Sequence, residues 1–295
     1  MPRNAKPSPH RRIQIVFALI LMTLLYLELS EQHNEPVLSI GSPYVLAAER
    51  PTVGGFEKLV RENPLGALID ARDRHVATVT SYRCTLVKQE LLPSGMSPEQ
   101  ELDVIHRLNP YSVVITYTRN ASLANRVVFV KDRWIDPDAD DPDERDLAVC
   151  QPGAVAQVLL KSIKMPIHGS MAKGAARRAV DEFGFKRTLD LLIKYCELAK
   201  SRGELGLKFC GETYFDGRPV WVIRRSLPYS SEGGMYPDRT AEIYIDKEYR
   251  VPIAVYCYSD EAREPQNLLG KYEYRDIQFD AQITDADFEP ATYGM

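Results

Sequence analysis

Apolar and polar residues alternate along much of the chain beyond residue 80, which is the pattern of half-buried β-strands. The segment Ser81–Leu92 shows the alternation clearly, because Tyr82, Cys84 and Leu86 fall on one face. The same criterion predicts strands at Glu101–Leu108, Ser112–Thr118, Arg126–Lys131, Leu205–Phe215, Pro219–Ser226, Thr240–Lys247, Val251–Tyr258 and Leu268–Phe279. Short strands of this kind, with few helices between them, indicate an antiparallel α+β domain.

Three segments carry apolar residues at three- and four-residue spacing instead, which predicts helices. One begins at Pro64 behind Asn63, since proline fits the first turn of a helix. In that helix His75 would be a surface or half-buried residue rather than a ligand. The other two span Val155–Ile163 and Lys186–Lys200. The domain is therefore expected to open with a helix and to be most helical in its middle.

Two of the predicted strands are apolar on both faces, at Val113 to Ile115 and at Val127 to Val130. A strand buried on both sides needs cover on both sides. In an antiparallel sheet this predicts a curled sheet whose concave face is filled by helices or by a ligand. Trp221 and Ile223 share one face of a later strand, and either face of that strand could line a cavity.

The N-terminus has the pattern of an export signal, with basic residues ahead of the apolar run Ile13–Leu27. As a helix this run would span roughly 22 Å, short of a ~30 Å hydrocarbon core. Residues 1–30 therefore form either a cleaved signal peptide or a short uncleaved signal-anchor. Residues 31–63, rich in proline and glycine, are expected to be a flexible tether, and residues 64–295 a single domain.

The negative net charge of the chain bears on which partners it can bind. The whole chain has a formal net charge of −4 although residues 1–30 are basic, so the exported part is more acidic still. Phosphate binding needs clustered lysine and arginine, which argues against nucleic acid as a partner.

No catalytic, cofactor or metal motif is present in the sequence. His168-Gly169-Ser170 lacks the glycine that a nucleophile elbow needs two residues before its serine. The acidic run of residues 136–144 resembles a calcium loop at its start, but Asp141 stands where the turn glycine belongs, so a solvated loop is expected. A glycosidase-like pair of carboxylates stays open, which keeps an uncharacterised hydrolase as a third alternative.

The cysteines and tyrosines leave alternatives open. Outside the cytoplasm the five cysteines allow one or two disulfides, whereas the other interpretation is that all are small buried apolar residues. They are Cys84, Cys150, Cys196, Cys210 and Cys257. The tyrosines concentrated between Tyr229 and Tyr293 predict either ordinary cross-strand packing or a carbohydrate-binding face.

The ordered segments resemble a known exported family, the domain of unknown function 1571. The resemblance is carried by the strand Tyr82 to Glu90, the pair formed by Val251 to Ile253 and Tyr272 to Tyr274, and the ending Thr284 to Pro290. It covers roughly residue 64 to the C-terminus. The family name implies no established activity.

More distantly, the order of elements is similar to that of the periplasmic lipoprotein carriers LolA and LolB and the sensor RseB. That resemblance implies a strongly curved antiparallel half-barrel, with helices over its concave face, enclosing an apolar cavity for acyl chains. The acidic insertion after Trp134 departs from the carriers. An uncleaved N-terminal anchor, one of the two alternatives for residues 1–30, would depart from them too, because a tethered protein could not shuttle cargo.

The sequence therefore predicts a non-enzymatic protein of the periplasm or cell envelope, in contact with the membrane through residues 13–27, that binds a lipid or lipoprotein acyl chain and needs no cofactor. The alternative is an envelope sensor or interaction module with a protein partner. A one-residue register error would exchange the two faces of each strand. The candidate cavity-lining residues are Val113, Ile115, Val127, Phe129, Trp221 and Ile223.

Overall fold

A computed structural model describes residues 55–153 and 160–295. The chain divides after Ser42, and all described residues belong to the unit Pro43–Met295. The predicted export signal, most of the predicted tether and most of the predicted helix Val155–Ile163 lie outside the described residues. In the part of the chain that is described, no helix has the length and apolar character needed to cross a bilayer.

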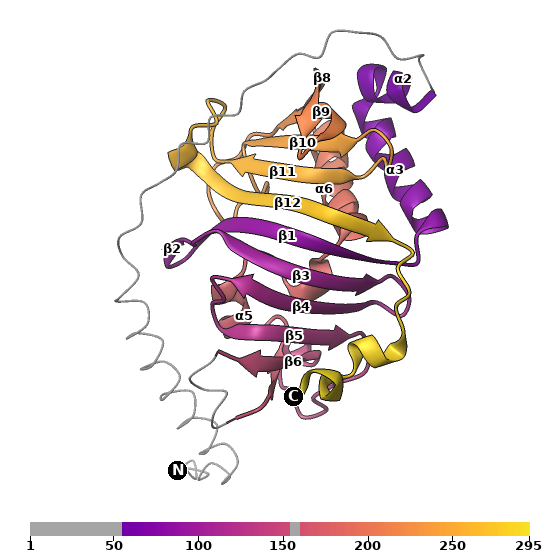
Figure 1. Cartoon of the computed structure of the whole chain (residues 1–295). Helices are drawn as coiled ribbons and strands as arrows, with labels where there is room; N and C mark the ends of the chain where they lie inside the picture. Colours follow the sequence, from indigo (N-terminus) through magenta and orange to yellow (C-terminus); the bar gives the residue numbers. More distant parts are fainter. Residues whose placement is uncertain (1–54, 154–159) are drawn as a thin grey trace, which may run out of the picture. The chain divides into compact units, whose positions relative to one another are not determined.

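Within the described residues, twelve strands form one antiparallel sheet (Figure 1). They are β1 (Ser81–Leu92), β2 (Gly95–Met96), β3 (Gln100–Arg107), β4 (Ser112–Arg119), β5 (Ala124–Val130), β6 (Leu147–Pro152), β7 (Ile163–Pro166), β8 (Gly206–Phe215), β9 (Arg218–Ser226), β10 (Thr240–Asp246), β11 (Pro252–Tyr258) and β12 (Leu268–Phe279). The order is β7-β6-β5-β4-β3-β1-β12-β11-β10-β9-β8, with β2 beside β1. The sheet is curved and unclosed, so the predicted α+β class with a curved antiparallel sheet is confirmed.

The centre of the sheet joins the two ends of the domain. β1 pairs with β12 in antiparallel register, with Leu86 opposite Tyr274. On either side of this pair, strands adjacent in sequence are adjacent in space. The predicted bounds of β1 and β12 are confirmed at both ends.

The helices lie on one side of the sheet, where Figure 1 shows α3 (Pro64–Thr78) and α6 (Phe185–Ser201). The predicted start of α3 is confirmed, since Asn63 caps it by accepting a 3.1 Å hydrogen bond from the backbone N–H of Gly66. A further helix, α2 (Gly55–Glu62), occupies the last residues of the segment predicted as a tether.

Two local predictions are wrong. His75 is 3% exposed and packs against the rings of Tyr82, Phe185 and Phe279, so it is a core residue and neither surface nor half-buried. Ile163 begins β7 rather than ending a helix. In both places the tertiary neighbours, which short-range spacing does not report, decide the outcome.

The convex face of β4 and β5 is covered by the C-terminal segment. Val114, Val128 and Val130 pack there against Phe288 of the 3₁₀ turn η4 (Asp285–Phe288). Arg83 reaches this turn and donates a 2.6 Å hydrogen bond to Asp287. The expectation that these strands are covered on both faces is therefore confirmed.

The concave face has a densely packed half, which we call the filled half. Here α2, α3 and α6 press large apolar side chains onto β9, β10 and β11. Phe56 of α2 lies against Trp221 of β9, with ring centroids 5.4 Å apart. The fully buried members of this cluster are Val60, Ala67, Leu68, Leu189, Cys196, Ile223, Ala241, Ile243 and Ile245.

Candidate ligand cavity

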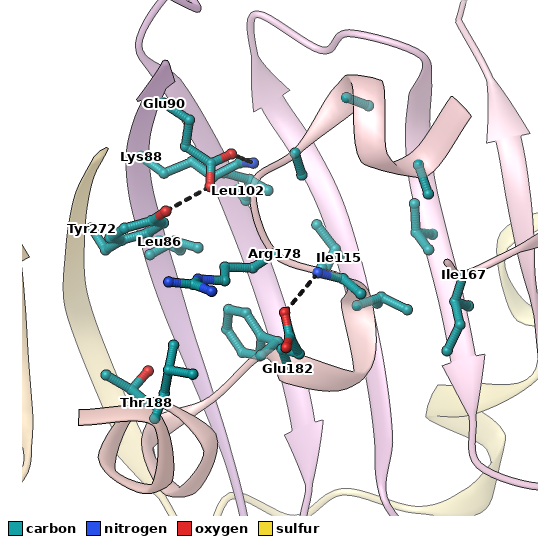
Figure 2. A pocket seen from close by; sticks show the side chains of 18 of the residues that line it. Leu86, Lys88, Glu90, Leu102, Ile115, Ile167, Arg178, Glu182, Thr188 and Tyr272 are labelled. Carbon is teal, nitrogen blue, oxygen red and sulfur yellow. Dashed lines mark hydrogen bonds and ion pairs between the residues drawn. The ribbon is translucent and has the colours of Figure 1, made fainter. Parts of the chain in front are cut away.

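The other half of the concave face, the open half, contains a cavity of about 210 Å³ (Figure 2). Its floor is formed by side chains of β1, β3, β4, β5 and β6, with further lining residues from β11 and β12. Its cover is the segment from Met165 to Phe183, which includes the short helix α5 (Ser170–Ala175), together with one face of α6 (Thr188, Leu191, Leu192 and Tyr195). The apolar floor residues are Leu86, Leu102, Ile115, Val127, Ala148 and Cys150.

Four alanines in the cover leave space above the floor of the cavity. The segment from Met165 to Phe183 brings these alanines to the cavity, whereas in the filled half α2, α3 and α6 bring phenylalanine, leucine and isoleucine onto the sheet. Alanine fills too little volume to reach the floor. An apolar cavity of ~150 Å³ can already hold a benzene-sized molecule, so the space here accommodates part of a hydrocarbon chain. The covering alanines are Ala172, Ala175, Ala176 and Ala179.

One end of the cavity carries a buried polar network. Lys88 donates a 2.6 Å hydrogen bond to Glu90, and the hydroxyl of Tyr272 donates to the same carboxylate at 2.7 Å. Burial alone would lower the pKa of Lys88, but the fields of Tyr117 and Glu90 together raise it. Burial and the charge of Glu90 hold the pKa of Tyr272 well above its usual value. This end therefore carries an internally neutralised ion pair and a neutral phenol.

A second buried ion pair lies on the wall that borders the filled half. Arg225 donates two hydrogen bonds to Asp238, at 2.7 and 2.9 Å, and each side chain is 2% exposed. Burial lowers the pKa of Arg225, but the charge and hydrogen bond of Asp238, together with Cys196 and Cys257, raise it above its usual value. Both members line the cavity. The bidentate geometry fixes this pair as part of the wall.

The structure divides the six predicted lining residues into three groups. Ile115 and Val127, which are paired across β4 and β5, line the cavity. Val113 and Phe129, the next pair along the same strands, belong to the adjoining core cluster but do not reach the cavity.

The remaining two, Trp221 and Ile223, lie in the filled half beneath the helices. Val220 and Val222 belong to a different cluster, as the alternation along this strand indicates. The sequence reasoning missed the alanines of the cover and Arg178, which also lines the cavity. The acid-free, alanine-rich stretch before Asp181 was the available signal.

Other candidate chemistry gains no support in the described residues. His168 Nε2 lies 3.2 Å from Asp181, but no hydrogen bond joins His168 to Ser170 in the described part of the chain. Along the acidic run, Asp138, Asp141 and Asp143 are exposed. No group of three side chains suited to holding a metal ion occurs among the residues that the structure describes.

The cysteines and tyrosines follow the simpler of their two interpretations. None of the five cysteines forms a disulfide, and all except Cys210 are buried. Burial raises the pKa of Cys150 to about 12, so its thiol at the cavity floor stays protonated. Tyr236, Tyr244, Tyr258 and Tyr274 are buried in the core, which indicates packing rather than a carbohydrate face.

The chain is similar to several known proteins. The sequence profile described as "Protein of unknown function (DUF1571)" matches residues 79–293. No curated protein sequence matches the chain. Among solved structures, MucB has 13% identity and a TM-score of 0.44, with 77% of this chain and 62% of MucB covered, so the chain spans less than two thirds of MucB.

Two further solved structures are similar along nearly their whole length. The lipoprotein LppX of Mycobacterium tuberculosis has 15% identity and a TM-score of 0.40, with 76% of this chain and 98% of LppX covered. A LolA superfamily protein from Nitrosomonas europaea has 8% identity and a TM-score of 0.32, with 76% and 97% covered.

Proposed function

The chain belongs to the DUF1571 family, and from that premise, which brings no activity with it, we propose that it is a non-enzymatic binding protein that holds a lipid acyl chain in the cavity of its open half. The observation that supports the proposal most directly is the cavity itself, about 210 Å³ in volume and walled mainly by aliphatic side chains. Few precisely placed polar groups in an apolar cavity are typical of a binding site for an apolar ligand.

The energetics favour a single chain over a bulky ligand. Burying each CH₂ group of a ligand is worth about 0.8 kcal/mol, so a few buried carbons give useful affinity. The floor residues Leu86, Ile115 and Val127 offer only aliphatic contact. Such contacts stabilise a hydrocarbon of any chemical origin.

The direct test is a titration of the purified full chain with linear alkan-1-ols of increasing length, followed by calorimetry. Affinity should rise about fourfold for each added CH₂ until the cavity is filled, and then level off. Native mass spectrometry of protein prepared without detergent should show a co-purified lipid. If no alcohol binds at any length, the proposal fails.

We also propose that the protein acts outside the cytoplasm, in the periplasm or cell envelope. The support is the basic head followed by the apolar run of residues 13–27, both outside the described residues. N-terminal sequencing of the protein recovered from fractionated cells distinguishes a cleaved signal from an anchor. Recovery from the cytoplasmic fraction with an intact N-terminus would contradict export.

A further inference from the structure

The charged residues of the cavity wall are unequally partnered. The wall carries three cations, and two of them, Lys88 and Arg225, are neutralised by buried carboxylates at hydrogen-bonding distance. Arg178 is the third. It is half-buried, and among the described residues no hydrogen bond or ion pair to it is found. Figure 2 shows its side chain extending across the middle of the cavity.

Glu182, an acid of the cavity wall, does not neutralise Arg178. Glu182 also lines the cavity, but its carboxylate accepts a 3.3 Å hydrogen bond from the backbone N–H of Ala179. No ion pair joins Glu182 to Arg178 within the described residues. The other two acids of the wall, Glu90 and Asp238, are already bonded to their own cations. The guanidinium is therefore left with its donors directed at the cavity.

A guanidinium in this setting favours an anionic partner. It presents five N–H donors in a planar fork that matches the two oxygens of a carboxylate or the oxygens of a phosphate. Its charge is costly to leave unpaired beside an apolar wall, and a paired charge interacts more strongly there than in water. An oxyanion that enters the cavity would accept hydrogen bonds from the guanidinium. Its attraction to the positive charge would also be stronger than in water, because the dielectric constant there is low.

We propose that the ligand of the cavity is an acyl amphiphile with an acidic head group, a carboxylate or a phosphate monoester, which pairs with Arg178 while its chain lies against Leu86, Ile115 and Val127. This inference rests on the proposed function and specifies its ligand class. Lys88 and Arg225 do not bind the head group in this proposal, because each is already paired with a buried carboxylate.

The test compares dodecanoate, dodecyl phosphate and dodecan-1-ol, each below its micellar concentration at pH 8, on the full chain and on Arg178→Gln. The wild-type protein should bind the two acids about tenfold or more tightly than the alcohol, as expected for charge-assisted hydrogen bonds. Arg178→Gln should lose that preference and bind the alcohol as before. Inorganic phosphate alone should not compete, because it lacks the chain.

The control is Lys173→Gln, which removes one positive charge from the exposed surface of α5 and should leave the preference intact. Circular dichroism melts confirm that each variant is folded, and Arg178→Lys should keep part of the preference. Equal binding of acids and alcohol by the wild type, or a preference that survives in Arg178→Gln, overturns the head-group inference. If the wild-type protein binds none of the three compounds, the proposed function is overturned instead.

Discussion

The two halves of the concave face use the same kind of strand and differ in what covers them. In the filled half, α2 brings Phe56, and the long helices α3 and α6 bring leucine and isoleucine, into one cluster with Trp221 and Ile223. In the open half, a short helix and irregular turns bring four alanines to the cavity above Ile115 and Val127, beside one face of α6. The sheet provides apolar surface throughout. Whether that surface becomes core or cavity is decided by the size of the covering side chains.

The largest effect on stability is expected in the filled half. Ile223→Ala should lower the free energy of unfolding by about 4 kcal/mol, because Ile223 is 0% exposed and the surrounding helices cannot collapse into the space. Urea denaturation followed by circular dichroism measures this change. A loss below ~1.5 kcal/mol would mean that the filled half is loosely packed.

A pH effect of intermediate size should arise where the halves meet. His75 and His106 are buried, and no hydrogen bond partner is present for either ring among the described residues. Burial lowers the pKa of His75 to about 4. Burial, with His75 and Arg187 nearby, lowers the pKa of His106 to about 3. The unfolded chain, with histidine pKa near 6.5, therefore takes up protons first as the pH falls.

The contribution of the neutral histidines to the free energy of unfolding is therefore at its maximum above pH 6.5, and it declines as the pH falls toward 4. Each histidine should contribute a slope of about 1.4 kcal/mol per pH unit in this window. Denaturation of the wild type and of His106→Phe at pH 7, 5.5 and 4.5 isolates one histidine, because the carboxylates are common to both. Identical slopes would contradict the assignment.

A smaller loss is expected for the same substitution in the open half. Ile115→Ala should cost about 2 kcal/mol, at the low end for this change, because Ile115 already borders a cavity on one side. The comparison with Ile223→Ala controls for chemistry, since the atoms removed are identical. A cost at Ile115 equal to that at Ile223 would show that the open half is as tightly packed as the filled half.

The smallest change in stability should follow from filling the cavity. Ala175→Leu places three further carbon atoms in existing space, so the free energy of unfolding should change by less than ~1 kcal/mol. Affinity for an alkan-1-ol should fall about tenfold or more, because each displaced CH₂ is worth about 0.8 kcal/mol. The exposed Ala262→Leu is the matched control, and calorimetry is the measurement. Undiminished affinity would place the ligand elsewhere.

The fold was largely predictable because local pattern and burial agree along the strands. Alternation set the bounds of β1 and β12, and helical spacing identified α6 within one residue at each end. β6 and β7 were missed because they are short and end in Pro152 and Pro166, which read as breaks in a strand pattern.

The cavity was predictable only in part. Ile115 and Trp221 occupy equivalent apolar positions in their strands, and nothing local to either strand reveals which lies beneath a helix. The distinction depends on contacts with residues far away in sequence. The placement of the covering alanines and of Arg178 at the cavity depends on the same long-range contacts, so alternation could identify the face but not the space above it.

The pairing of β1 with β12 has a consequence for how the chain reaches its native state. Tyr272 donates a hydrogen bond to Glu90, a residue 182 positions earlier, so the middle of the sheet is built from strands that are synthesised far apart in time. Topologies dominated by such distant contacts fold slowly, over milliseconds to seconds. We therefore expect β1 to remain unpaired with β12 until β12 has left the ribosome. During that interval the apolar surface of both halves is accessible to chaperones.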